Sequence, residues 1–271
     1  RFHGATKLGF RGDSIAEFDW SVGELMKTLD RLGLAEKTLI VLCSDNGPVM
    51  DDGYKDGALE QRGDHRAGGP YRGGKYSVYE GGTRTPFITR WKGRIQPGVS
   101  AEVVSTIDLA ASLAALTGTA LPADACGDSI DVSGALLGKP GAKGREHYVQ
   151  QDNGGTGNFG FRVGNWKLVR YETKFANNEI VEQPLQRTAQ PQFQLFDLAK
   201  DPGEQTDVFA KNPEVGEKLK ARLAAIVAAA DAAPVNDAVQ REVILGQTAD
   251  RQHVMGVDAS SVRINADAER G

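Results

Sequence analysis

The sequence predicts an α/β domain with a mostly parallel sheet flanked by helices, followed by a small antiparallel sheet with one helix. Three patterns support this fold class. A helical pattern over residues 14–32 leads through a short loop into the buried-strand pattern Thr38–Cys43. A second helical pattern covers Thr106–Leu116. Beyond residue 140 the chain reads as short strands joined by tight turns, which is typical of antiparallel pairing.

The first helix is predicted to begin at Ser14, because Ser14 and Glu17 have the spacing of a capping box. Gly33 supplies a stop. Between them apolar residues recur at helical spacing: Ile15, Phe18, Val22, Leu25, Met26, Leu29 and Leu32. The strand that follows points its carboxyl end at Asp45 and Asn46, and ligands of α/β folds gather beyond such strand ends.

Residues 47–74 are polar and glycine-rich, and too long for a simple connection, so they read as a functional loop. Pro86–Trp91 is strand-like. Further on, residues 161–163 and 166–171 form a predicted hairpin around Gly164-Asn165, and Phe193–Leu198 adds a strand. A helix begins at Pro213. These patterns predict domains over residues 1–145 and 146–232, with a tail of uncertain structure over 233–271.

Composition excludes several classes of function. The 271 residues carry a formal net charge of −4, which gives no electrostatic reason to expect nucleic acid or an anionic membrane as a partner. No run approaches the roughly 18 apolar residues of a membrane span. The two cysteines, Cys43 and Cys126, do not form a disulfide framework or a zinc site.

Two short segments suggest chemistry, and each has a plainer interpretation. Asp45-Asn46-Gly47 is either an ordinary turn or a pair of oxygen ligands for Ca²⁺ or Mg²⁺. Lys75, preceded by Gly73-Gly74, is either a solvated surface charge or a contact for the anionic oxygens of a sulfate or phosphate group.

The order of these motifs decides between the interpretations. SDNGP followed by GGKYSVYEGGTRTPF resembles the arylsulfatase family, in the arylsulfatase A-like branch of the alkaline phosphatase superfamily. FDWSVGELMKTLDRLGL, PGVSAEVVSTIDLAASLAALTG, FRVGNWKLVR and FQLFDLAKDPGEQTDV resemble further family segments in family order. The resemblance covers about residues 10–230 and implies an alkaline phosphatase-like fold.

The resemblance implies a role for each matching residue. Asp45 and Asn46 match metal ligands, with Ca²⁺ favoured over Mg²⁺, and Lys75 matches a catalytic lysine that contacts the substrate sulfate. Glu80 and Arg84 match motif positions and are expected to form a buried ion pair that holds the loop of Lys75. His65, in the same glycine-rich loop, is either a substrate contact or an exposed histidine without a role.

The family's nucleophile is a formylglycine made from the cysteine of Cys-x-Pro-x-Arg, and this motif does not occur in the 271 residues. Cys43 and Cys126 have the wrong neighbours, and Arg1-Phe2-His3-Gly4 does not resemble the family's Pro-His segment. We therefore expect the nucleophile and the remaining metal ligands upstream of this chain, which alone should be inactive. Family habit implies a secreted or periplasmic protein.

The leading interpretation is a sulfuric ester hydrolase acting on a small-molecule or glycan sulfate ester. Two alternatives stay open. A phosphodiesterase or phosphonate hydrolase of the same superfamily would share parts of the metal site, and a catalytically incomplete fragment would only bind. The presence of Cys-x-Pro-x-Arg upstream would favour the sulfatase.

Overall fold

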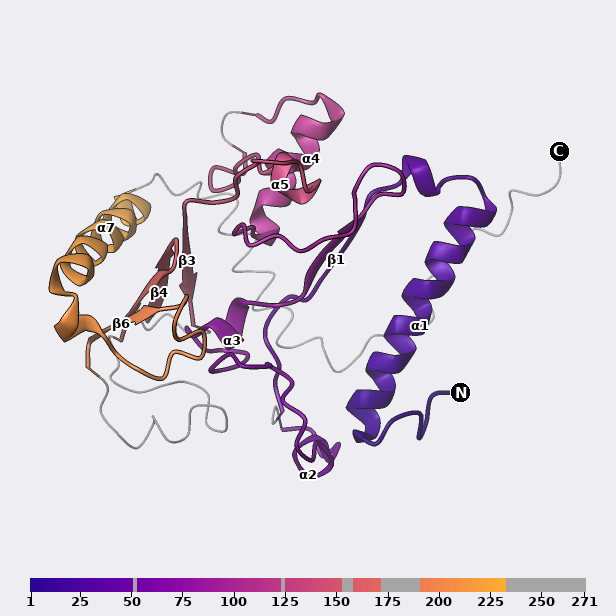
Figure 1. The fold of residues 1–271 in the computed structure, drawn as a ribbon, viewed down its shortest axis with the longest axis horizontal. Coiled ribbons are helices and arrows are strands. Elements are labelled where there is room, and N and C mark those ends of the chain that lie inside the picture. Colours follow the sequence, from indigo (N-terminus) through magenta and orange to yellow (C-terminus); the bar gives the residue numbers. More distant parts are fainter. Residues whose placement is uncertain (51–52, 123–124, 153–157, 172–190, 233–271) are drawn as a thin grey trace. The chain divides into compact units, whose positions relative to one another are not determined.

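The computed structural model describes residues 1–50, 53–122, 125–152, 158–171 and 191–232 (Figure 1). The chain divides between residues 221 and 222, inside the last helix of the described residues, and each side is described by itself. The domain boundaries predicted at residues 145 and 232 stay predictions. The predicted tail, 233–271, lies outside the described residues.

The first helix, α1, spans Gly9–Arg31 and is not capped by a side chain. The predicted capping box at Ser14 is wrong, because residues 9–13 are already helical and a serine caps only where the preceding backbone leaves the helix. Instead, the Asp13 carboxylate accepts the N–H groups of Gly4 (2.7 Å) and Thr6 (2.8 Å) and so fixes the segment before the helix.

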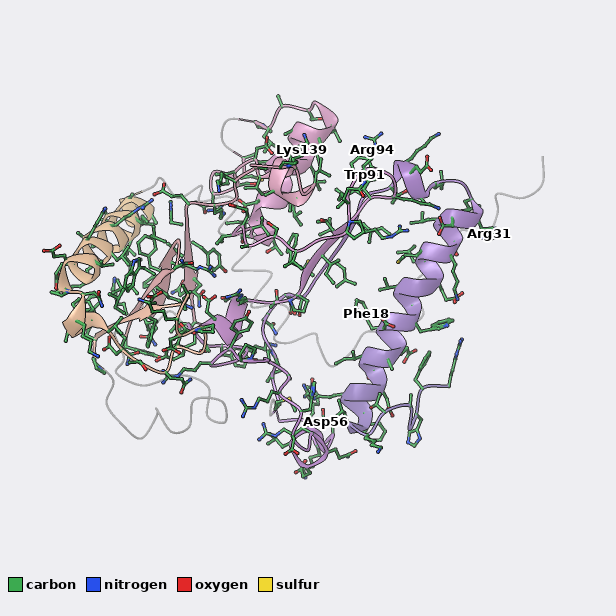
Figure 2. All side chains as sticks on the ribbon, in the orientation of Figure 1. Phe18, Arg31, Asp56, Trp91, Arg94 and Lys139 are labelled. Carbon is green, nitrogen blue, oxygen red and sulfur yellow. The ribbon has the colours of Figure 1, made fainter. Side chains whose placement is uncertain are left out.

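The apolar spacing that predicted α1 does not lead to a buried stripe within the described residues. Ile15 is 66% exposed and Phe18 55%, and Figure 2 shows Phe18 standing out from the helix. Further exposed apolar residues of α1 are Phe10, Trp20 and Leu25.

The helix is followed by strand β1, Ile40–Cys43, which pairs with β2, Phe87–Arg90. This helix–strand order is the one expected of an α/β domain. The pair is antiparallel, however, with Ile40 opposite Arg90 and Cys43 opposite Phe87. The expected parallel pairing is absent from the described strands, because the chain returns to the same end of β1 before it enters β2.

The long connection between these strands holds two short helices, α2 (Ala58–Gln61) and α3 (Glu80–Thr83), along the predicted functional loop and just after it. Asp56 ties this loop to α1, because its carboxylate lies 2.6 Å from Arg11 Nε. The other carboxylate oxygen of Asp56 accepts the N–H of Ala58 at 2.9 Å.

The predicted second helix is confirmed as the 3₁₀ turn η2, Thr106–Asp108, continued by α4, Leu109–Thr117, and it ends at Gly118 with φ 68°. A short helix, α5, covers Ser133–Leu136. Asp108 is completely buried, accepts the N–H groups of Ser105 and Ile130, and lies 2.8 Å from Arg145 Nε. This carboxylate therefore fixes the start of α4 to the chain on either side.

The predicted hairpin is confirmed within a four-stranded antiparallel sheet of order β3-β4-β5-β6. The strands are β3 (His147–Gln151), β4 (Phe159–Val163), β5 (Trp166–Arg170) and β6 (Phe193–Asp197). Gly164, at φ 57°, makes the turn between β4 and β5. Strand β3 was not predicted.

The core of this part forms where the chain just before α3 packs on the sheet. Val78 and Tyr79 cluster with Val169, Tyr171, Phe196 and Leu198. The Tyr79 ring lies 6.0 Å from that of Phe196, and its hydroxyl donates to Gln194 Oε1 at 2.9 Å. The sheet thus buries the chain that follows Lys75.

The chain continues through the 3₁₀ turn η3, Phe209–Lys211, into α7, Pro213–Ala232. The predicted helix start at Pro213 is confirmed. Lys220, on the first part of α7, lies with its ammonium 4.7 Å from the centre of the Phe193 ring. None of the described helices combines the length and apolar character needed to cross a bilayer.

Candidate active site

The segment Ser44–Gly47 directly follows β1 and is held by short local hydrogen bonds. Ser44 Oγ donates to the carbonyl oxygen of Asn46 at 3.0 Å, and Asn46 Nδ2 donates to that of Gly47 at 2.9 Å. Asp45 is exposed and Asn46 is half-buried. The turn interpretation and the ligand interpretation are therefore compatible, since the turn presents both side chains at the strand end.

Gly47 brings this segment against the second predicted motif. Its N–H donates to the carbonyl oxygen of Gly82 at 2.8 Å, and a Cβ atom on Gly47 would lie only 1.7 Å from the carbonyl oxygen of Gly81. One residue further on, the carbonyl of Pro48 accepts the N–H of Lys75 at 2.9 Å. Only glycine allows such a close approach of two backbones, so Asp45-Asn46 and Lys75 are held as neighbours through the main chain.

Residues 72–80, which we name the Lys75 loop, fold back on themselves. The carbonyl of Arg72 accepts the N–H of Gly81 at 2.7 Å, which closes the loop at its base. Gly73 has φ 83° and Tyr76 has φ 77°, a conformation uncommon for a residue with a side chain. Lys75 is half-buried, and its ammonium lies 5.2 Å from the centre of the Tyr76 ring.

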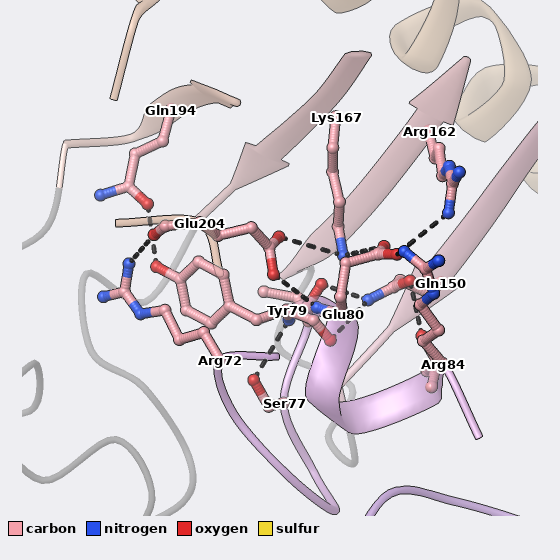
Figure 3. Close-up of polar contacts among 12 residues, drawn as sticks. Arg72, Ser77, Tyr79, Glu80, Arg84, Gln150, Arg162, Lys167, Gln194 and Glu204 are labelled. Atoms are coloured by element: carbon pink, nitrogen blue, oxygen red, sulfur yellow. Dashed lines mark hydrogen bonds and ion pairs between the residues drawn. The ribbon is translucent and has the colours of Figure 1, made fainter. Parts of the chain in front are cut away.

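Glu80, at the end of this loop, is 3% exposed and has three cationic partners (Figure 3). Lys167 Nζ lies 3.0 Å from Oε1, and Arg162 and Arg84 lie 3.0 and 3.5 Å from Oε2. Burial raises the pKa of Glu80, but Lys167, Arg162 and Arg84 together outweigh burial and lower that pKa below its usual value. Glu80 is therefore ionised in the folded protein near neutral pH.

The predicted Glu80–Arg84 pair exists but is the longest of the three, and the Arg84 side chain is 43% exposed. The Arg84 guanidinium lies 4.4 Å from the centre of the Tyr71 ring. The closer partners of Glu80 come from β4 and β5. The loop is thus anchored mainly by the antiparallel sheet.

Glu204 is a second buried carboxylate at the same place (Figure 3). Its Oε2 accepts the N–H of Glu80 at 2.6 Å, and its Oε1 lies 3.3 Å from Lys167 Nζ. Burial raises the pKa of Glu204 above its usual value, against the lowering effects of Lys167 and the Glu80 N–H group. Lys167 therefore lies between two carboxylates that differ in how readily they take up a proton.

Sequence reasoning missed Lys167, Arg162 and Glu204. Lys167 and Arg162 lie in the FRVGNWKLVR segment, and Glu204 in DPGEQ, but both segments were considered only as family markers. A signal was present: Lys167 stands among apolar residues in a strand buried on both faces, where a lysine needs a charged partner.

Asp45 and Asn46 supply the type of donor atom that a hard cation prefers, but too few donors to complete its coordination. A carboxylate and an amide carbonyl are oxygen donors that suit Ca²⁺, which takes six to eight such ligands. Among the described residues no group of three or more His, Cys, Asp or Glu side chains could hold a metal ion. Other ligands would have to complete the site.

His65 lies in an exposed turn, where its N–H donates to the carbonyl of Arg62 at 3.0 Å. No contact described for its ring joins it to Asp45, Asn46 or Lys75. Its expected role as a substrate contact stays a prediction.

Two protein-family models match the chain. The "Sulfatase" model covers residues 6–119, and the model "N-sulphoglucosamine sulphohydrolase, C-terminal" covers residues 73–229, more than half of the chain. The two models overlap over residues 73–119, which include Lys75 and α3.

Curated relatives agree with these models. The chain is 43% identical over 226 residues to an N-acetylgalactosamine-6-O-sulfatase of Bacteroides thetaiotaomicron, covering 83% of the chain and 43% of the relative. It is 36% identical over 223 residues to human arylsulfatase A, covering 77% of the chain and 41% of the relative. The chain thus spans less than half the length of these relatives.

A solved structure from work on glycosaminoglycan metabolism by Bacteroides thetaiotaomicron is also similar. It superposes with a TM-score of 0.75 at 42% identity, covering 83% of this chain and 46% of that one. The fold that the sequence predicts, a partial alkaline phosphatase-like α/β domain with a C-terminal antiparallel sheet, is confirmed by this likeness.

Proposed function

The chain belongs to the sulfatase family, and from that premise we propose that the protein hydrolyses a sulfate ester. The observation that carries the proposal is the backbone contact between the two motifs. Gly47 and Pro48 bind Gly82 and Lys75 through main-chain hydrogen bonds, so a cation held by Asp45-Asn46 and the ammonium of Lys75 would act on the same anion. Charges fixed beforehand around a reacting anion are effective because they need no reorganisation.

Each residue then has one task. Asp45 and Asn46 would hold a divalent cation, Ca²⁺ rather than Mg²⁺, and such an ion, when bound, supplies polarisation of the sulfate oxygens. Lys75 binds and orients the sulfate as a compact positive charge. Glu80, with Arg84 as its most exposed partner, keeps the end of the Lys75 loop in place, and His65 is a further candidate for substrate contact.

The nucleophile is proposed to be a formylglycine upstream of these residues. Two facts support this. The motif Cys-x-Pro-x-Arg does not occur in the sequence, and the chain matches only 43% of the first of its curated relatives. We expect the 271 residues alone to be inactive on an aryl sulfate in the presence of calcium.

For the substrate we propose a sulfated sugar, because the relative with 43% identity is named an N-acetylgalactosamine-6-O-sulfatase. An aryl sulfate would report the chemistry, and a 6-sulfated N-acetylgalactosamine would report this specificity.

The test uses the complete gene product, assayed for release of sulfate from both compounds with calcium and with chelator. Lys75→Ala should lower kcat/KM by about 10²–10³-fold, and Asp45→Ala should abolish the effect of calcium. Lys37→Ala, an exposed lysine, is the matched control and should leave activity unchanged.

Two outcomes would overturn the proposal. Faster turnover of an aryl phosphonate monoester than of any sulfate would favour the phosphonate hydrolase. Binding of a sulfated sugar without release of sulfate would favour a protein that only binds.

A further inference from the structure

The turn after β6 presents a buried carboxylate, Glu204, that no step of the proposed reaction uses. Asp201 stabilises this turn, because its carboxylate oxygen Oδ2 accepts the N–H groups of Gln205 and Thr206, both at 2.7 Å. Glu204 itself has φ 52°, in the left-handed region, and is 0% exposed. A residue with a side chain held in this conformation and fully buried suggests that the side chain has a task.

Glu204 contacts both ends of the Lys75 loop. Its carbonyl oxygen accepts Arg72 Nη1 at 2.7 Å, and its carboxylate accepts the N–H of Glu80 at 2.6 Å. The same turn approaches the chain before the loop, since a Cβ atom on Gly203 would lie 3.0 Å from the carbonyl oxygen of Pro70. Figure 3 shows Arg72, Glu80 and Glu204 meeting beside Tyr79.

The loop is further stiffened by one cation–aromatic contact within it and by ionic contacts to Lys167 of the sheet. The Arg72 guanidinium lies 4.0 Å from the centre of the Tyr79 ring, and Lys167 Nζ lies between the carboxylates of Glu80 and Glu204. Lys75 lies between the two points that Glu204 holds, and its own N–H is hydrogen-bonded to Pro48.

We propose that Glu204 is a positioning residue that holds Lys75 against the Asp45-Asn46 segment by clamping both ends of residues 72–80. This inference rests on the proposed role of Lys75 in binding sulfate. The Glu204 side chain is suited to the task because its hydrogen bond from the Glu80 N–H, at 2.6 Å, lies in a water-excluded place, where a hydrogen bond is stronger than in water. Removing the carboxylate leaves that N–H buried without an acceptor.

The first test compares variants in the complete gene product, with folded protein quantified by thermal melting. Glu204→Gly removes the carboxylate at a φ that suits glycine, and should lower kcat/KM for the sulfate ester by about 10–100-fold. Glu204→Gln keeps an oxygen that can accept the Glu80 N–H, and should recover kcat/KM to within about fivefold of the parent. Lys200→Ala alters the same turn at a side chain that is 85% exposed, and should have no effect.

A double-mutant cycle separates positioning from a general structural role. If Glu204 acts through Lys75, Glu204→Gly should lower kcat/KM by less than about twofold once Lys75→Ala is present. An equal loss with and without Lys75, or no loss in the single variant, would overturn the inference.

The second test does not depend on activity. Hydrogen exchange of the Lys75 and Glu80 amides should speed up by about tenfold or more in Glu204→Gly, while the amides of Leu113–Thr117 in α4 stay unchanged. If the protein hydrolyses no sulfate ester, the proposed function fails. The hydrogen-exchange measurement then tests the positioning role of Glu204 by itself. Unchanged exchange at both loop amides would overturn it.

Discussion

Lys167 allows the sharpest test of how the Lys75 loop is anchored. The change is Lys167→Met, which keeps the length of the side chain and removes the charge. The Lys167 side chain is 0% exposed, and its ammonium lies 3.0 Å from Glu80 and 3.3 Å from Glu204. The variant would leave two buried carboxylates facing each other across an apolar side chain, with Arg162 and Arg84 as the cations that still contact Glu80.

The magnitude follows from these distances. At an effective dielectric constant near 20, each contact is worth about 5 kcal/mol of Coulomb energy. The cost of desolvating the ammonium cancels much of the total. Removing one member of a buried ion pair costs about 3–5 kcal/mol in practice. For a protein of at least this length, such a loss lowers Tm by about 6–20 °C.

The assay is thermal and urea unfolding of the complete gene product. The matched control is Lys143→Met, because Lys143 also lies 3.1 Å from a carboxylate, that of Glu102, but its side chain is 81% exposed. This control should change the free energy of unfolding by less than about 1 kcal/mol. Equal effects of the two variants would refute the reasoning, because they would mean that burial does not strengthen the Lys167 contacts.

Three other changes give independent predictions. Gly47→Ala should force two backbones apart by about 1.3 Å, because the new Cβ would lie 1.7 Å from Gly81 O and real contacts do not fall below 3.0 Å. In urea unfolding, this variant should be destabilised by about 1–3 kcal/mol. In a calcium titration, it should need a higher calcium concentration for activity. Asp108→Asn should cost about 1–3 kcal/mol in urea unfolding, because an amide cannot accept from two backbone N–H groups and Arg145 as the carboxylate does. Glu204→Gln tests pH dependence. Burial raises the pKa of Glu204, so the folded protein keeps the carboxyl proton to a higher pH than the unfolded chain does. The stability that Glu204 contributes therefore falls as pH rises above the pKa of the unfolded chain, about 4.3. The difference in unfolding free energy between parent and variant should therefore be smaller at pH 7 than at pH 4.5, and a difference that grows with pH would contradict this.

Local signals predicted most of the secondary structure. Pro213 at a helix start, Gly118 after a helix and Gly164 in a two-residue turn act through backbone geometry within a few residues, so a sequence pattern captures them. The capping box at Ser14 failed because its effect depends on whether the preceding residues are helical. The antiparallel pairing of β1 with β2 was missed because strand direction depends on the path of the intervening chain.

The candidate site was predicted in part for a similar reason. Asp45, Asn46 and Lys75 lie in motifs whose order can be read along the chain, although their roles stay predictions. The residues that anchor Glu80 lie more than 80 positions away, and no spacing rule connects them. Only the folded sheet brings Lys167 and Arg162 to that carboxylate.

The hydrogen bond between Pro48 and Lys75 has a consequence for how such a protein can diversify. This bond joins the two ends of the loop that runs from Pro48 to Lys75, while residues 60–67 of the same loop are exposed. Because lengthening a loop whose ends are fixed costs little free energy, we expect substitutions and insertions at residues 60–67 to leave the positions of Asp45 and Lys75 unchanged. On the proposed function, exchanging residues 60–67, which include His65, between relatives is expected to change substrate preference while Asp45 and Lys75 keep their positions.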